Sequence, residues 1–297
     1  MNKKPRIAFC FSWQARTLDQ TYIFFKKNLF DAAKEQGFDY DVFCAVEDDE
    51  DVDKVNLLKP TKVEKIKSND VEKIIINQHK TFMYEALNKK YCFIVQKNFK
   101  NFLQQLYKVW MSIMIKEDYQ KDKKVNYSLV IRVRFDWPLF NKINFMKVLS
   151  EISDDSIICI EPKITYPYWR IFHISDCFFI GTDKSIQCLS NIFYQIEKCF
   201  YWHEISQPLY IFKYIFSNIK NWINRVNEYQ KIIHFPLFFI WLAETYFYTV
   251  FTSELCYETY FNNNNIRIDK YKFSNILFRK DPESTQIHLF KKNKYEL

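Results

Sequence analysis

The segment VIRVRFDWP, residues 130–138, places two guanidinium groups and a carboxylate close together. Because successive side chains of a β-strand point to opposite faces, Arg132, Arg134 and Asp136 would share one face of a strand. Paired guanidinium N–H groups suit a diphosphate, and a carboxylate suits a divalent cation or a sugar hydroxyl. An ion-pair ladder on a half-exposed strand is the structural alternative. The dense apolar residues around these charges favour a functional role, since unpaired charge in a central strand is costly.

The segment SWQART, residues 12–17, is a second candidate because it follows an expected strand and precedes an expected helix. Backbone N–H groups at a helix start bind anions, and Arg16 would add positive charge, so this loop suits a phosphate. Ordinary capping of the helix by Thr17 or Asp19 explains the same residues equally well. Both interpretations stay open on the residues alone.

The most conspicuous charge cluster is the acidic run, residues 47–53, with the sequence EDDEDVD. It contains Asp-x-Asp spacings, but blocks of like charge usually stay in water, so we expect a solvated loop rather than a metal site. The pair His203 and Glu204 lacks the second histidine of a zinc helix. No serine has the flanking glycines of a nucleophile elbow, so hydrolase chemistry finds no support.

The elements that must position these residues are typical of an α/β fold. Residues 6–13 form an apolar run suited to a buried strand, helical spacing predicts a helix from about residue 19 to a C-cap at Gly37, and residues 39–46 predict a second strand. This order favours a parallel sheet. Residues 129–133 should form a central strand, and ligands of such sheets bind beyond the carboxyl ends of the strands.

The remaining chain predicts further short strands and then a helical, aromatic-rich part. Short strands are expected at 156–160 and 177–180, and helices at 183–201, 206–230 and 237–252, followed by short strands near 266–268 and 275–278. No repeat or Pro/Gly/Ser-rich linker interrupts the sequence. We therefore expect one domain over 1–297, with an α/β part at 1–182 and a mainly helical part at 183–297.

The composition excludes several classes of protein. The 297 residues are 48% hydrophobic and 26% charged, as in a folded globular protein, and the two glycines rule out a glycine-rich phosphate loop. The net charge of +8 suits an anionic ligand, a nucleic acid or an acidic membrane surface. The eight cysteines are scattered and lack a C-x-x-C pair, which indicates reduced core thiols in a cytoplasmic protein. The N-terminus is expected to form a strand rather than a signal peptide, and no apolar segment has the length of a membrane span.

Six motifs together resemble a family of bacterial and large-virus glycosyltransferase-like proteins associated with capsule and lipopolysaccharide assembly. They are S-x-Q-x-R-T, DYDVFCAV, YSLVIRVRFDWPLF, ISDCFFIGTDKSI, AETYF and ILFRKD, in this order over roughly residues 5–281. The likeness is strongest at VIRVRFD and ISDCFFIG. It implies a GT-A-like, Rossmann-like nucleotide-sugar-binding sheet with a helical, aromatic-rich C-terminal elaboration on the acceptor side.

Matched residue by residue, the resemblance implies roles for seven side chains. Asp136 is implied to hold a divalent cation, Mn²⁺ or Mg²⁺, in addition to binding the donor. Arg134 stands where the usual D-x-D motif has its first Asp, so metal dependence stays open. The sequence departs from the family pattern at Trp13, where a glycine is expected, and at Ala243, where a proline is expected. The implied donor-binding residues are Gln14, Arg16, Arg132, Arg134 and Asp136, and the implied catalytic residues are Asp176 and Glu244.

The resemblance thus predicts a cytoplasmic glycosyltransferase that moves a sugar from a nucleotide-sugar donor to a glycan or lipid-linked acceptor. Asp176 or Glu244 would take the proton of the acceptor hydroxyl, while a turn cap and a buried acid bonded to a tyrosine are their structural alternatives. The aromatic helices between residues 206 and 252 would pack as core or lie on the inner face of the membrane. A basic single-stranded nucleic-acid-binding protein and a non-catalytic scaffold are the alternative functions, although dispersed lysines argue against nucleic acid.

Overall fold

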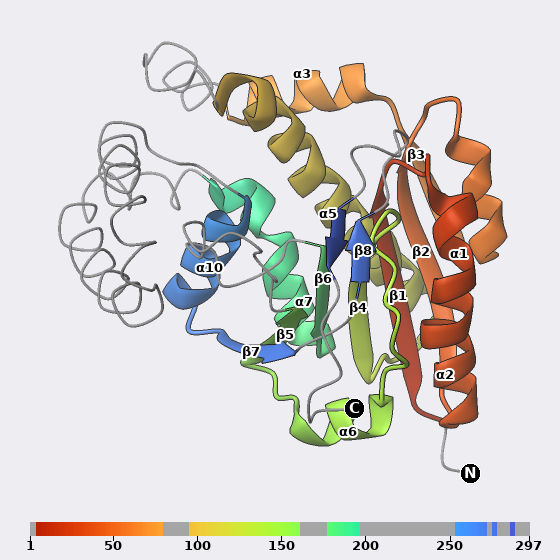
Figure 1. Ribbon diagram of the computed structural model, residues 1–297. Coiled ribbons are helices and arrows are strands. Elements are labelled where there is room, and N and C mark those ends of the chain that lie inside the picture. Colours follow the sequence, from red (N-terminus) through yellow and green to blue (C-terminus); the bar gives the residue numbers. More distant parts are fainter. Residues whose placement is uncertain are drawn as a thin grey trace, which may run out of the picture.

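The computed structural model describes residues 4–79, 95–160, 177–196, 253–271, 275–277 and 286–288. Its centre is a seven-stranded mixed sheet of order β3-β2-β1-β4-β6-β5-β7, with helices on both faces (Figure 1). A separate antiparallel pair joins β8 (Asn275–Leu277) to β9 (Gln286–His288). The α/β architecture predicted from the sequence is confirmed, and the order of strands and helices is compatible with a Rossmann-like fold.

Four parallel strands form one half of the sheet, and β1 lies between β2 and β4. Strands that are covered on both faces read as near-continuous apolar runs, which is why the sequence predicted β1, β2 and β4 within a residue of their observed ends. The outer strand β3 has the charged sequence KVEKI, which gave no apolar pattern that predicts a strand. The four strands are β1 (Arg6–Trp13), β2 (Asp39–Glu47), β3 (Lys62–Ile66) and β4 (Leu129–Arg134).

The other half of the sheet contains β5 (Ser156–Ile160), β6 (Phe178–Gly181) and β7 (Arg267–Tyr271). β6 runs antiparallel to both β4 and β5, whereas β5 and β7 are parallel. β6 therefore begins at the edge of the sheet where β1 to β5 end. We call this edge the carboxyl edge; the chain reaches it at Trp13, Glu47, Ile66, Arg134 and Ile160.

One face of the sheet is covered by the helical segment after β1, by η2 (Val52–Leu58) and by α6 (Phe145–Glu151). The segment after β1 consists of α1 (Leu18–Phe25), the π-helical turn η1 (Lys26–Phe30) and α2 (Asp31–Glu35). Gly37 follows with φ of 82°, and its N–H donates to the carbonyl oxygen of Lys34 at 3.0 Å. A left-handed glycine that ends a helix matches the predicted C-cap.

The opposite face is covered by α3 (Ser68–Gln78), α5 (Val95–Lys123), α7 (Asp183–Ser190) and α10 (Ser253–Asn263). Alternate residues of each strand enter the two cores: Phe9 and Phe11 of β1 pack on the α1 side, and Ala8 and Cys10 pack on the α5 side. The helices expected at 206–230 and 237–252 lie outside the described residues.

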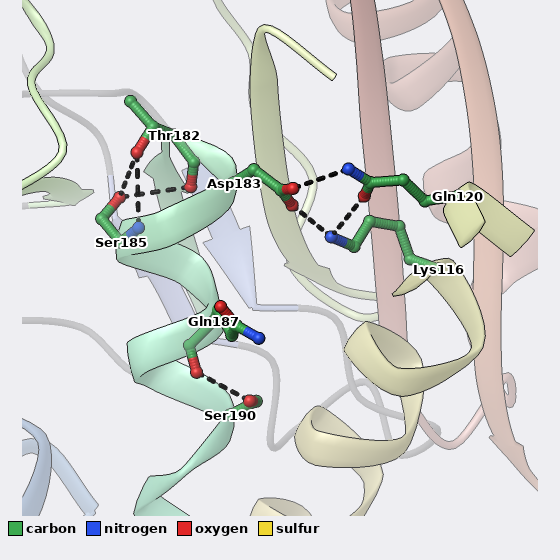
Figure 2. Close-up of polar contacts among 7 residues, drawn as sticks. All are labelled: Lys116, Gln120, Thr182, Asp183, Ser185, Gln187 and Ser190. Carbon is green, nitrogen blue, oxygen red and sulfur yellow. Dashed lines mark hydrogen bonds and ion pairs between the residues drawn. The ribbon is translucent and has the colours of Figure 1, made fainter. Parts of the chain in front are cut away.

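The turn from β6 into α7 explains why the ISDCFFIG motif ends in glycine. A Cβ atom on Gly181 would lie 2.3 Å from Ser185 Oγ and 2.8 Å from Ile186 Cγ1. Thr182 caps α7 by accepting a hydrogen bond from the backbone N–H of Ser185. Asp183 then pairs with Lys116 of α5 and accepts a hydrogen bond from Gln120 Nε2 at 2.8 Å (Figure 2). The longer motif ISDCFFIGTDKSI, which includes Thr182 and Asp183, thus joins β6, α7 and α5.

The cysteines of the described residues are free thiols, and all but the half-buried Cys188 are buried. Burial raises the pKa of the Cys10 thiol to about 12. Within the described ranges, none of the helices combines the length and apolarity that crossing a bilayer demands.

Candidate functional site

The direction of strand order reverses between β1 and β4. From β1 the chain moves outward through β2 and β3, and it then returns to the other side of β1 with β4. In open α/β sheets, ligands bind beyond the carboxyl ends of the strands at such a switch point. Ser12 and Arg134 are neighbours in the register of these two strands, so the ends of β1 and β4 mark the candidate site.

Arg134 and Asp136 form a buried, bidentate ion pair at the end of β4. Arg134 Nε donates to Asp136 Oδ1 at 2.9 Å, and Arg134 Nη2 donates to Asp136 Oδ2 at 2.8 Å. Asp136 is fully buried and Arg134 is 7% exposed. The backbone N–H of Arg134 also donates to the carbonyl oxygen of Cys177, which ties this strand end to the start of β6. The pair is therefore a fixed part of the carboxyl edge.

Arg132 lies deeper than Arg134, opposite Cys10 of β1 and Phe179 of β6. It is fully buried. Its neighbour Val130 packs in the core on the α5 side, and strand alternation places Arg132 and Arg134 on this same face. The shared face predicted for the two arginines is consistent with this packing, but Arg132 sits inside the protein rather than at its surface.

The loop after β1 brings the second candidate segment to the same edge. Gln14 and Arg16 are partly exposed, whereas Thr17 is buried. Thr17 occupies the N-cap position of α1, but its side chain makes no capping hydrogen bond, so the capping role considered for Thr17 is wrong. Thr21 Oγ1 donates to the carbonyl oxygen of Phe135 at 2.7 Å, which holds α1 against the chain beyond β4.

Trp13, the last residue of β1, links this loop to the ion pair. The Arg134 guanidinium carbon lies 5.0 Å from the centroid of the indole ring, and Lys108 Nζ of α5 lies 5.4 Å from it. Both distances are within the range of cation–π attraction. Trp13 has φ of 122°, a conformation that favours glycine and that costs a residue with a side chain about 1–3 kcal/mol. The family pattern implied a glycine at this position, and the backbone angle gives a physical reason for one.

Lys108 is a site residue that sequence reasoning missed. Its side chain is buried and pairs with Glu47 at the end of β2, and Glu47 also accepts a hydrogen bond from Ser68 at the start of α3. The available signal was a lysine among the apolar positions of α5, with Ser112 and Lys116 following at helical spacing. Lys108 and Arg134 thus both lie against the Trp13 ring at the end of β1, and each is paired with a carboxylate, Glu47 and Asp136 respectively.

The acidic run is only partly the solvated loop that we expected. The side chain of Glu47 is half-buried and pairs with Lys108, whereas Asp48, Glu50 and Asp53 are exposed. Asp49 Oδ1 accepts a hydrogen bond from the backbone N–H of Asp51 at 3.0 Å. Burial, together with neighbouring carboxylates, raises the pKa of Asp49. This segment is thus held by specific contacts at both ends.

A divalent cation at Asp136 does not fit the described residues. Both carboxylate oxygens of Asp136 accept hydrogen bonds from Arg134. The described ranges also contain no group of three or more His, Cys, Asp or Glu side chains placed to hold a metal ion. The described donor set therefore assigns Asp136 to Arg134 rather than to Mn²⁺ or Mg²⁺.

The structure brings four of the seven sequence-predicted residues to the carboxyl edge at the switch point, namely Gln14, Arg16, Arg134 and Asp136, with Arg132 buried below them. Asp176 and Glu244 lie outside the described residues. No protein-family model matches the chain, and a search of curated proteins gives no significant match.

Proposed function

We propose that this chain is a nucleotide-sugar-dependent glycosyltransferase of GT-A-like fold, with its donor site at the ends of β1 and β4. One observation carries the proposal. The two motifs SWQAR and VIRVRFD, which are far apart in the sequence and are both part of the family resemblance, meet at the switch point of the sheet. A switch point is the general ligand site of open α/β sheets.

The exposed fractions of the side chains suggest how the donor is held. Arg16 and Gln14 are partly exposed and are the direct contacts, with Arg16 on the diphosphate and Gln14 on a donor hydroxyl or phosphate oxygen. The ion pair of Arg134 and Asp136 is buried and orients the edge of β4 beside them. In sugar transfer, cations stabilise the negative charge that develops on the leaving diphosphate.

The acceptor side of the proposal rests on the family resemblance. The acceptor is a glycan or a lipid-linked sugar of a surface polysaccharide, and the reaction takes place in the cytoplasm or at the inner face of the membrane. Asp176 or Glu244 takes the proton of the attacking hydroxyl, because an inverting transfer needs one carboxylate within hydrogen-bond reach of it.

Calorimetric titration of UDP, GDP and CMP, with and without Mn²⁺, tests the donor site. We expect one nucleotide to bind the wild type, and Arg16→Gln to weaken it about tenfold, as loss of a charge-assisted hydrogen bond predicts. Arg267→Gln is the matched control, because it removes the same charge at the start of β7, where Arg267 pairs with Asp269 at 3.0 Å. This control should bind like the wild type.

The proposal fails if none of the three nucleotides binds in either condition. Salt-dependent binding of a single-stranded oligonucleotide would then support the nucleic-acid alternative. Nucleotide binding without release of labelled sugar from any matching nucleotide sugar, in the presence of glycan and lipid-linked acceptors, would support the non-catalytic scaffold.

A further inference from the structure

The ammonium group of Lys54 joins three segments that meet beside the candidate site. Lys54 Nζ donates to the carbonyl oxygen of Arg16 at 2.8 Å. It also pairs with Asp51 Oδ1 at 3.1 Å and with Asp19 Oδ2 at 3.2 Å. These acceptors belong to the loop after β1, to the acidic run and to the first turn of α1. One side chain on η2 therefore connects all three.

The three contacts match the three hydrogen-bond donors of a lysine ammonium. Burial opposes the charged form, but hydrogen bonds to Asp51 and Asp19 outweigh it and raise the pKa of Lys54. The group thus remains charged across the neutral range. Its contact with a backbone carbonyl restrains the main chain at Arg16 and leaves the guanidinium of Arg16 available for a ligand.

A second lysine, Lys65, shows that a lysine can pair with the acidic run without contacting the loop after β1. Lys65 pairs with Asp53 at 3.3 Å, and the side chains are 51% and 82% exposed. Exposed pairs of this kind add little stability. The pair of Lys65 and Asp53 has the same chemistry as Lys54 and Asp51, but it joins η2 to β3 rather than to the loop after β1.

We infer that Lys54 is a positioning residue that fixes the backbone of residues 14–17 for phosphate binding, with Asp51 of the acidic run and Asp19 as its counter-charges. What the loop binds rests on the proposed function. Asp51 of the acidic run is then a counter-ion of the lysine that holds the loop. The acidic run thereby has a structural role, whereas its Asp-x-Asp spacings taken alone would suggest a metal site.

Hydrogen exchange and nucleotide titration together test this inference. Lys54→Met should speed amide exchange in residues 14–20 about tenfold, through easier local opening, and should raise the dissociation constant of the bound nucleotide about tenfold. Lys54→Arg keeps the charge and should restore most of both effects. Asp51→Asn should change both in the same direction but less, because Asp19 remains beside the ammonium.

Lys65→Met and Asp53→Asn are the matched controls and should leave exchange and binding at wild-type values. The inference is overturned if Lys54→Met leaves exchange in residues 14–20 unchanged, or if the Lys65 variant changes it equally. A uniform loss of protection across the whole sheet would also overturn it, since it would show a general structural role. If the wild type binds no nucleotide, the proposed function fails, while the exchange data still decide the role of Lys54.

Discussion

Replacing Asp136 by asparagine removes one charge from the buried ion pair at the end of β4 and preserves the shape of the side chain. Asp136 is fully buried and accepts two hydrogen bonds from Arg134, which is 7% exposed. Removing one partner of a buried pair typically costs about 3–5 kcal/mol, because a charge then stays in a poorly solvated place. Asparagine keeps one acceptor oxygen, so we expect a loss of about 3 kcal/mol, the lower end of this range.

Urea unfolding of the wild type, Asp136→Asn, Arg134→Met and the double variant measures this effect. Because the two side chains contact each other, the double variant should lose less free energy of unfolding than the two single variants together, by about 1–3 kcal/mol. Additivity within about 0.5 kcal/mol would refute the reasoning, since it would mean that the pair does not form.

Millimolar Mn²⁺ or Mg²⁺ provides the second arm of this experiment. Neither cation should shift the urea midpoint of the wild type through Asp136, because both of its oxygens already accept hydrogen bonds from Arg134. A cation-dependent stabilisation that Asp136→Asn abolishes would refute the assignment of Asp136 to Arg134 and would restore it as a metal ligand.

Three further predictions concern the scaffold. Gly181→Ala should lower the free energy of unfolding by about 1–3 kcal/mol, measured in urea, because the added Cβ would lie 2.3 Å from Ser185 Oγ; a neutral result would contradict the close packing of α7. Cys10 should resist iodoacetamide in the native protein at pH 8 and react after unfolding, as peptide mapping can show, because burial raises its pKa to about 12 and the thiolate is the reactive form. Burial and a hydrogen bond to Asp41 raise the pKa of Tyr127 above its usual value of 10.0, so this tyrosine releases its proton only on unfolding at alkaline pH. Stability should therefore fall as the pH rises above 10.0, and Tyr127→Phe should reduce that slope in urea titrations; an unchanged slope would contradict the assignment.

The strands of the sheet were largely predictable, because burial on both faces leaves a continuous apolar run in the sequence. The range predicted for β5 agrees with the observed strand, and the range for β4 ends one residue early. β3 could not be found in this way, since an edge strand with one exposed face tolerates lysine and glutamate. The antiparallel direction of β6 was also unpredictable, because no local pattern records which way a buried strand runs.

The candidate site was predictable as far as the strand extends. Alternation placed Arg132 and Arg134 on one face, and it applies because both belong to β4. Asp136 lies beyond the end of β4, where a turn decides its direction and Thr21 of α1 holds the neighbouring carbonyl of Phe135. The contact between Asp136 and Arg134 therefore depends on tertiary structure.

The position of β1 between β2 and β4 has a consequence for how the chain folds during synthesis. Its pairing with β2 is local, so the β1–β2 pair can form soon after residue 47 leaves the ribosome. Its other side pairs with β4, where Ile7 meets Leu129, so that side has no partner until a much longer nascent chain has emerged. Long-range pairing of this kind is slow and leaves an open strand exposed to wrong associations. Chaperone dependence in the cell should therefore concentrate in the interval before β4 is translated.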